Sequence, residues 1–89
     1  METKKHDSPF EVSGLNLIGT MVRALVDIPE KVEIKAVRGE QTTVFEIKVD
    51  KTDLGKVIGK QGKTARSIRQ IVHGFSAKSK MRAVVEIIE

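Results

Sequence analysis

The sequence has 89 residues, no cysteine and a net charge of +4. Hydrophobic residues make up 39% of the chain and charged residues 31%, a composition typical of one small globular domain. The lack of cysteine excludes disulfides and thiolate metal sites, and two histidines far apart in sequence make no zinc site, so we expect no cofactor or metal. No apolar run is long enough to span a membrane and no secretory signal is evident, which predicts a soluble, cytoplasmic protein.

The charge is unevenly distributed along the chain. Residues 1–53 contain eight Lys or Arg and ten Asp or Glu, a balance of −2, whereas residues 54–89 contain eight and two, a balance of +6. No acidic residue occurs between Leu54 and Val85. A basic surplus confined to one half of a small domain favours an anionic polymer as its partner over an ordinary solvated surface.

The N-terminal part of the chain predicts one helix. Residues 1–13 are polar, so we expect a flexible extension there, with Phe10 in the tail, and a folded domain over residues 14–89. Ser8-Pro9-Phe10-Glu11 fits a capping box, but Gly14 and Gly19 argue against one long rigid helix. The stronger helical pattern begins near Leu15 and must end before Pro29. Its apolar face is expected to consist of Ile18, Met21, Val22 and Leu25.

The middle of the chain predicts a β-hairpin. Apolar and polar residues alternate over residues 32–37 and again over residues 44–49, the pattern of strands with one buried face. The short polar link Arg38-Gly39-Glu40-Gln41 reads as a turn, which makes the pair antiparallel.

The C-terminal part predicts a helix, a loop, a second helix and a strand. Asp50 can cap a short helix that Gly59 ends, with Asp53 in its first turn against the helix dipole. A long amphipathic helix follows the loop to about Lys78, with Gly74 as a local weakness, and residues 81–88 form the last strand. The order αββααβ predicts an α+β two-layer sandwich, with a three-stranded mixed sheet and its helices on one face.

The loop Gly59-Lys60-Gln61-Gly62 is the most informative stretch. Glycines allow a sharp turn and a close approach of a ligand to the backbone, and the basic neighbours indicate that this ligand is anionic. A nucleotide-hydrolase phosphate loop would need glycine where Val57 stands, and the glycine spacing does not fit a dinucleotide fingerprint. We find no paired carboxylates in a cleft and no nucleophile with a nearby base, so the sequence does not predict an enzyme or a small-molecule substrate.

These features favour a site for a nucleic-acid backbone. The glycines would admit sugar-phosphate, the free N–H groups of the following helix would attract phosphate, and the cations would hold the strand. Ile58 and Val57 could form an apolar floor for bases, and core packing is expected of at least one of them. With only three Phe and no Tyr or Trp, stacking is unavailable, so base selectivity should be modest. The candidate RNA-binding residues are Lys56, Ile58, Gly59, Lys60, Gln61, Gly62, Lys63, Arg66 and Arg69.

Three stretches resemble the KhpA family of small bacterial single-KH-domain proteins. They are residues 22–32, residues 53–65 with Ile68-Arg69, and the ending Val85-Glu86-Ile87-Ile88-Glu89. The resemblance implies a type II KH fold and a cytoplasmic, RNA-chaperone-like protein that binds single-stranded RNA with low sequence specificity. It also implies pairing with itself or with a larger KhpB (Jag) protein, in post-transcriptional control tied to cell elongation and division.

Two features depart from the family pattern. Residues 1–14 extend beyond the usual start, and His73-Gly74-Phe75 replaces a stretch that is usually rich in alanine, which puts dimer formation in question. An alternative function is a protein-interaction adaptor whose RNA binding is weak or incidental. Its motivation is the face of the sheet opposite the helices, where Val37, Val44, Val84 and Ile88 are expected to lie.

Overall fold

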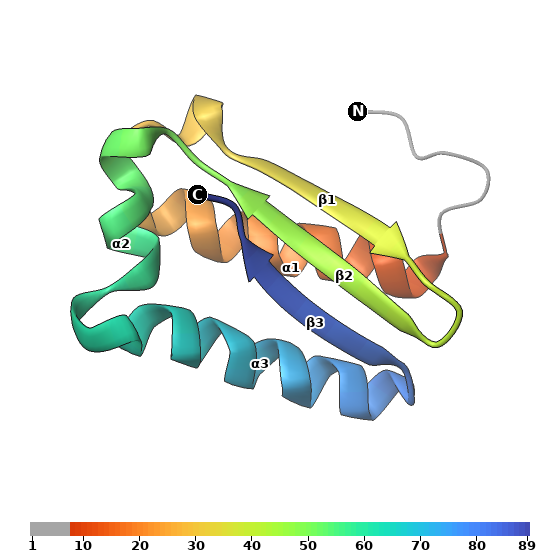
Figure 1. Ribbon diagram of the computed structural model, residues 1–89. Helices are drawn as coiled ribbons and strands as arrows, with labels where there is room; N and C mark the ends of the chain where they lie inside the picture. The colour runs from red at the N-terminus through yellow and green to blue at the C-terminus, as the bar shows by residue number, and fades with distance from the viewer. Residues whose placement is uncertain (1–7) are drawn as a thin grey trace.

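The computed structural model describes residues 8–89, which form three helices and a three-stranded sheet (Figure 1). The helices are α1 (Pro9–Leu25), α2 (Leu54–Ile58) and α3 (Lys63–Ser79). The strands are β1 (Glu33–Arg38), β2 (Thr42–Lys48) and β3 (Arg82–Ile87). Short 3-10 turns at Pro29–Lys31, Lys51–Asp53 and Lys60–Gly62 connect them.

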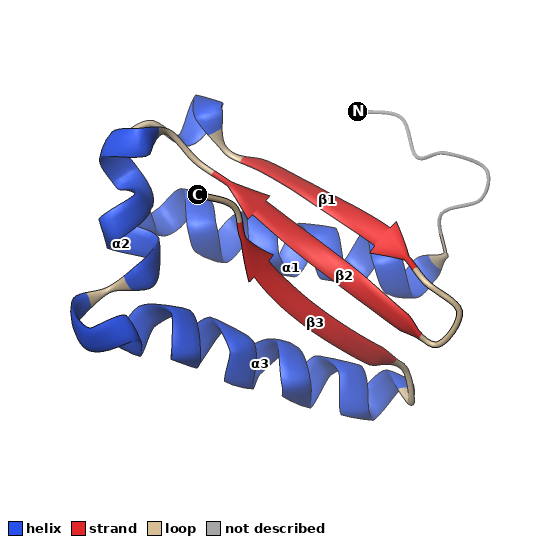
Figure 2. Cartoon of the chain, viewed as in Figure 1, coloured by secondary structure: helices blue, strands red, loops and turns tan. Residues whose placement is uncertain are grey.

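The sheet has the order β1-β2-β3, with β1 antiparallel to β2 and β2 parallel to β3 (Figure 2). The long α2–loop–α3 passage provides the crossover that a parallel pair needs. α1 packs against β1 and β2, and α3 packs against β3. The predicted α+β sandwich with a mixed sheet is therefore confirmed.

The core lies between the sheet and the helices. Phe45 and Ile47 of β2 and Ile18 and Val22 of α1 are completely buried. α3 adds Ile68 and Val72, as its helical spacing predicts. Leu25 was expected on the buried face of α1, but it is the last residue of that helix and is 40% exposed.

α1 begins at Pro9, not near Leu15. The Ser8 hydroxyl accepts a hydrogen bond from the Glu11 N–H at 3.1 Å, and the Glu11 carboxylate accepts one from the Ser8 N–H at 3.4 Å, which completes the capping box. Gly14 lies inside α1 without breaking the helix. A glycine fits this position because the ring of Phe45 occupies the space next to it: a Cβ there would lie 2.7 Å from Phe45 Cε1. α1 therefore starts five residues before residue 14, where the domain was expected to begin, and residues 1–7 lie outside the described part of the chain.

Side chains of the first turn of α1 contact β1, β2 and α3. Phe10, expected in a flexible tail, stacks on Phe75 with ring centroids 4.8 Å apart. Its ring centroid also lies 6.0 Å from that of Phe45. Glu11 is buried and accepts hydrogen bonds from Arg38 Nε at 2.6 Å and Nη2 at 2.9 Å. Arg38, expected in a turn, is the last residue of β1. Phe75, one of the departures from the family pattern, therefore packs on a residue of the N-terminal extension.

Candidate functional site

The site begins with the placement of α2 against the end of α1. Asp53 is buried, and its carboxylate accepts hydrogen bonds from the backbone N–H groups of Asp27 at 3.1 Å and Ile28 at 2.9 Å. Asp53 was expected to act on the dipole of α2, but it anchors α2 to the chain that leaves α1. Asp50 does cap the preceding turn, because its carboxylate accepts from the Thr52 N–H.

Lys56 belongs to this anchor. Its Nζ lies 3.3 Å from Asp27 Oδ2 and 3.6 Å from Asp53 Oδ1. The hydrogen bond and charge of Asp27, followed by the charge of Asp53, raise the pKa of Lys56. Burial alone would raise the pKa of Asp53, but the two N–H donors and Lys56 outweigh it and hold that pKa below its ordinary value. Phosphate would have to compete with two carboxylates for Lys56.

The loop after α2 has the backbone that its glycines predict. Gly59 ends α2 with φ +79° and Gly62 precedes α3 with φ +75°, conformations that side chains rarely adopt. A Cβ on Gly59 would lie 2.7 Å from Thr64 Cβ, whereas a Cβ on Gly62 would meet nothing within 4 Å. Gln61 also has a positive φ, +58°, and its carbonyl accepts from Arg66 Nη2 at 3.3 Å. Glycine is thus needed at position 59 both for its positive φ and because a side chain would collide with Thr64. At position 62 it is needed for its positive φ, and the space next to it is open to a ligand.

The cations beside this loop are exposed and uncompensated. Lys60, Lys63, Arg66 and Arg69 are all exposed, and none forms an ion pair within the described residues 8–89. Gly62 has no side chain to cap α3, and the backbone N–H of Lys63, the first residue of that helix, donates to the Lys60 carbonyl. The helix dipole adds further attraction for an anion at this position.

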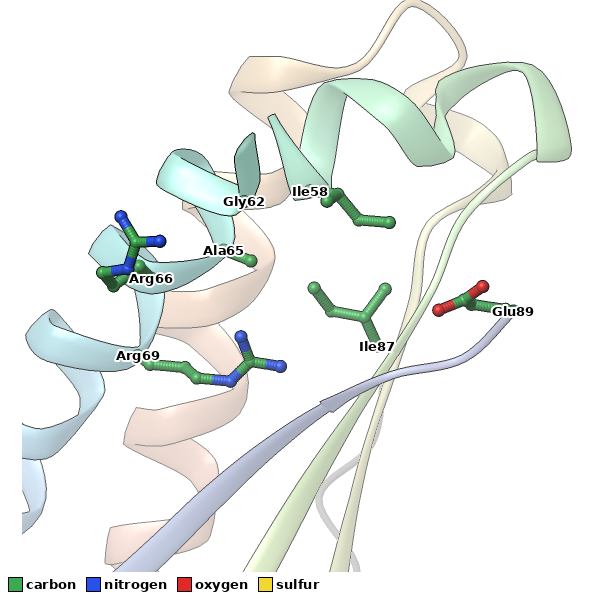
Figure 3. A pocket seen from close by; sticks show the side chains of 7 residues that line it. All are labelled: Ile58, Gly62, Ala65, Arg66, Arg69, Ile87 and Glu89. Atoms are coloured by element: carbon green, nitrogen blue, oxygen red, sulfur yellow. The ribbon is translucent and has the colours of Figure 1, made fainter. Parts of the chain in front are cut away.

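A groove of about 390 Å³ runs beside the loop, between α3 and the end of β3 (Figure 3). Val57 is completely buried in the core, whereas the half-buried Ile58 points into the groove. Ile87 faces Ile58 from β3, and the Arg69 side chain extends from α3 toward β3. The residues that line the groove are Ile58, Gly62, Ala65, Arg66, Arg69, Ile87 and Glu89.

Sequence reasoning missed three residues of the groove. Ala65 was assigned only to the core face of its helix, and Ile87 and Glu89 were not proposed as site residues. The strand alternation carries a signal for the last two, because Val85, Ile87 and Glu89 fall on the helix side of the sheet. A second hollow continues along α3 and β3 past His73, which is exposed.

Other classes of site find no support in the described residues. Within residues 8–89, no three His, Cys, Asp or Glu side chains are grouped so that they could hold a metal ion. No helix in the same range has the length and apolar character needed to cross a membrane.

The chain is similar to solved structures that share its fold. A chain of Aquifex aeolicus Era bound to GDP and aluminium fluoride superposes with a TM-score of 0.65 at 16% identity, over 91% of this chain and 31% of that one. A second Era structure, in complex with MgGDPNP and nucleotides of 16S ribosomal RNA, superposes with a TM-score of 0.59 at 18% identity. The chain spans about a third of these larger proteins, and the likeness concerns the fold alone.

Sequence relatives are much closer. RNA-binding protein KhpA of Caldanaerobacter subterraneus subsp. tengcongensis is 47% identical over 72 residues, which cover 81% of this chain and 96% of that protein. RNA-binding protein KhpA of Aquifex aeolicus is 42% identical over 74 residues, 83% of this chain and 94% of that one. These relatives are named as binding proteins and not as enzymes. The sequence profile described as "KhpA/KhpB, KH domain" matches residues 16–87. The chain therefore belongs to the KhpA/KhpB family of KH-domain proteins.

Proposed function

We propose that this protein binds single-stranded RNA by its backbone, on the loop Gly59–Gly62 and the first turns of α3. The observation that carries the proposal is the group of exposed cations around the glycine loop that form no ion pair within residues 8–89, Lys60, Lys63, Arg66 and Arg69. Ile58 offers apolar contact to a base in the adjoining groove. Lys56 contributes less than the other cations, because Asp27 and Asp53 already neutralise it.

Most of the binding depends on the RNA backbone, so the overall sequence specificity is low. The protein acts as an RNA chaperone in the cytoplasm. The relatives named RNA-binding protein KhpA support the RNA ligand. The family description, which joins KhpA with KhpB, supports a KhpB-type partner alongside or in place of a second copy of this chain. We extend the proposal to post-transcriptional control linked to cell elongation and division, as the family resemblance implies.

The decisive test replaces Gly62 by Asp and, as a matched control, by Asn. Both side chains have open space, and both residue types tolerate the left-handed backbone better than most, so the pair differs mainly in charge. Gly62→Asp should lower RNA affinity at least about tenfold more than Gly62→Asn, measured by fluorescence anisotropy with a labelled single strand. Equal affinities of the two variants would contradict the proposed site. Gly59 is less suitable because a side chain there would collide with Thr64.

The salt dependence of RNA binding gives an independent measure of how many phosphates the protein contacts. If four cations each neutralise one phosphate, the logarithm of the association constant should fall against the logarithm of salt concentration with a slope of roughly −3. Lys63→Gln should reduce this slope by about 0.7, whereas Lys56→Gln should change it less because Lys56 is already paired. A slope near zero would mean that the phosphates do not carry the binding.

A second candidate function is a protein-interaction adaptor. Val37, Val44 and Val84 are partners in register across the three strands, and Val37 and Val84 are 47% and 49% exposed. If this row carries a partner, Val37→Thr/Val84→Thr should weaken self-association in sedimentation with no effect on RNA binding. Ile71→Thr, on the exposed face of α3, provides the control. Sedimentation unchanged in the double variant would exclude the valine row as the pairing surface.

A further inference from the structure

The groove beside the loop has two chemically different sides. Its floor is apolar, formed by Ile58, Ala65 and Ile87, and one side carries Arg66 and Arg69 of α3. On the other side, Figure 3 shows the Glu89 carboxylate directed toward Ile87 and the groove. Glu89 is the one acidic residue among those that line it.

The strand pattern explains why Glu89 lies on this side. Val85 is buried against the helices and Glu86 is exposed, and the Ile88 N–H still donates to the Ile47 carbonyl at 2.9 Å. The alternation of β3 therefore continues to the end of the chain described, with Ile88 on the outer face and Glu89 on the helix side.

The Glu89 carboxylate constrains how a nucleic acid can lie. It forms no ion pair with any cation in residues 8–89, so its two oxygens can accept hydrogen bonds from a ligand. A phosphate next to it would be repelled, whereas phosphates are attracted along Lys60, Lys63 and Arg66. The phosphates should therefore follow the loop and α3, and an edge of a base should face Glu89.

Resting on the RNA binding proposed above, we propose that Glu89 selects the base in this groove, favouring guanine and rejecting uracil. A carboxylate accepts hydrogen bonds and donates none. The Watson–Crick edge of guanine presents two adjacent donors, N1–H and the N2 amino group, which match the two carboxylate oxygens. Cytosine and adenine present one amino group beside an acceptor nitrogen. Uracil presents a single N–H between two carbonyl oxygens, which the carboxylate repels.

The experiment uses the full chain and short labelled oligouridine strands that carry one variable base at the centre. We expect the wild-type protein to bind the strand with guanine about tenfold more tightly than the all-uridine strand, with cytosine and adenine between them. Glu89→Gln should remove most of that ratio, chiefly by binding the all-uridine strand more tightly. Glu86→Gln is the matched control, because it makes the same change of charge on the outer face of β3 and should keep the ratio.

Each result decides the inference. An unchanged ratio in Glu89→Gln, a wild-type protein with no base preference, or an equal loss in Glu86→Gln would overturn it. The proposed function fails separately, if the wild-type protein binds no strand or if Gly62→Asp binds as well as Gly62→Asn. Thermal melting of both glutamine variants checks that the fold is unaltered, as expected for two exposed side chains.

Discussion

The two ends of the sandwich differ in whether their charged and aromatic side chains have partners within residues 8–89. At the hairpin end, which comprises the start of α1, the β1–β2 turn and the last turns of α3, Glu11 is paired with Arg38 and Phe10 is stacked on Phe75. At the loop end, which comprises α2, the glycine loop, the start of α3 and the end of β3, four cations and Glu89 have no ionic partner within residues 8–89. Figure 1 shows these ends on opposite sides of the molecule. The first end stabilises the fold, and the second is left available for a ligand.

The largest expected effect comes from the hairpin end, at Gly14. Gly14→Ala would place a methyl group 2.7 Å from Phe45 Cε1, in a core where Phe45 is completely buried. Overpacking of this kind should lower the free energy of unfolding by about 2 kcal/mol, measured by urea titration. Gly19→Ala is the control in the same helix, because its methyl group would meet only the mobile end of Arg23, so stability should stay equal or rise. Equal losses in both variants would contradict the packing argument.

The next effect concerns Glu11 and Arg38. Glu11→Gln keeps an acceptor for the capping box but removes the charge that Arg38 binds at 2.6 Å, so we expect a loss of about 1 to 2 kcal/mol in the free energy of unfolding. Because the Arg38 side chain is 51% exposed, solvent screens its charge and the loss stays modest. A double-mutant cycle with Arg38→Gln isolates the coupling, and a coupling near zero would show that the pair does not stabilise the fold. RNA affinity should not change in either variant.

Asp53 lies at the loop end, where it fixes α2 to the chain that leaves α1, and it predicts a pH dependence. Its folded-state pKa lies below the ordinary value of 3.8, so its stabilisation is complete above that value and is lost as pH falls through the folded pKa. We expect Asp53→Asn to lower the melting temperature at neutral pH and to flatten its decline on acidification. Part of the decline should remain, since the hydrogen bonds of Thr52 also lower the pKa of Asp50. Identical acid limbs for the variant and the wild type would contradict the anchor.

The sequence predicts the loop end more completely than the hairpin end, for a physical reason. Positive φ angles, a helix start without a side-chain cap and a run of basic residues are local properties, so Gly59, Gly62, Lys60 and Lys63 can be recognised within one short stretch. Long-range contacts leave no such local pattern. Lys56 reads as one more cation of the loop until Asp27 is found beside it, and Phe10 reads as a tail residue until Phe75 is found stacked on it.

The smallest effect, and the sharpest comparison of the two ends, comes from Gly55 and Gly74. Both are exposed helical glycines with ordinary φ angles, and a Cβ at either would meet nothing within 4 Å, so alanine should raise the free energy of unfolding by about 0.5 to 1 kcal/mol at either site. Gly55 lies one turn before Gly59 and on the same side of α2 as Ile58, whereas Gly74 lies near the far end of α3. We therefore expect Gly55→Ala to gain stability but to bind RNA several-fold more weakly, and Gly74→Ala to gain stability alone. If both variants bind RNA like the wild type, the open surface of α2 is not used by the ligand, and the RNA footprint ends at the loop.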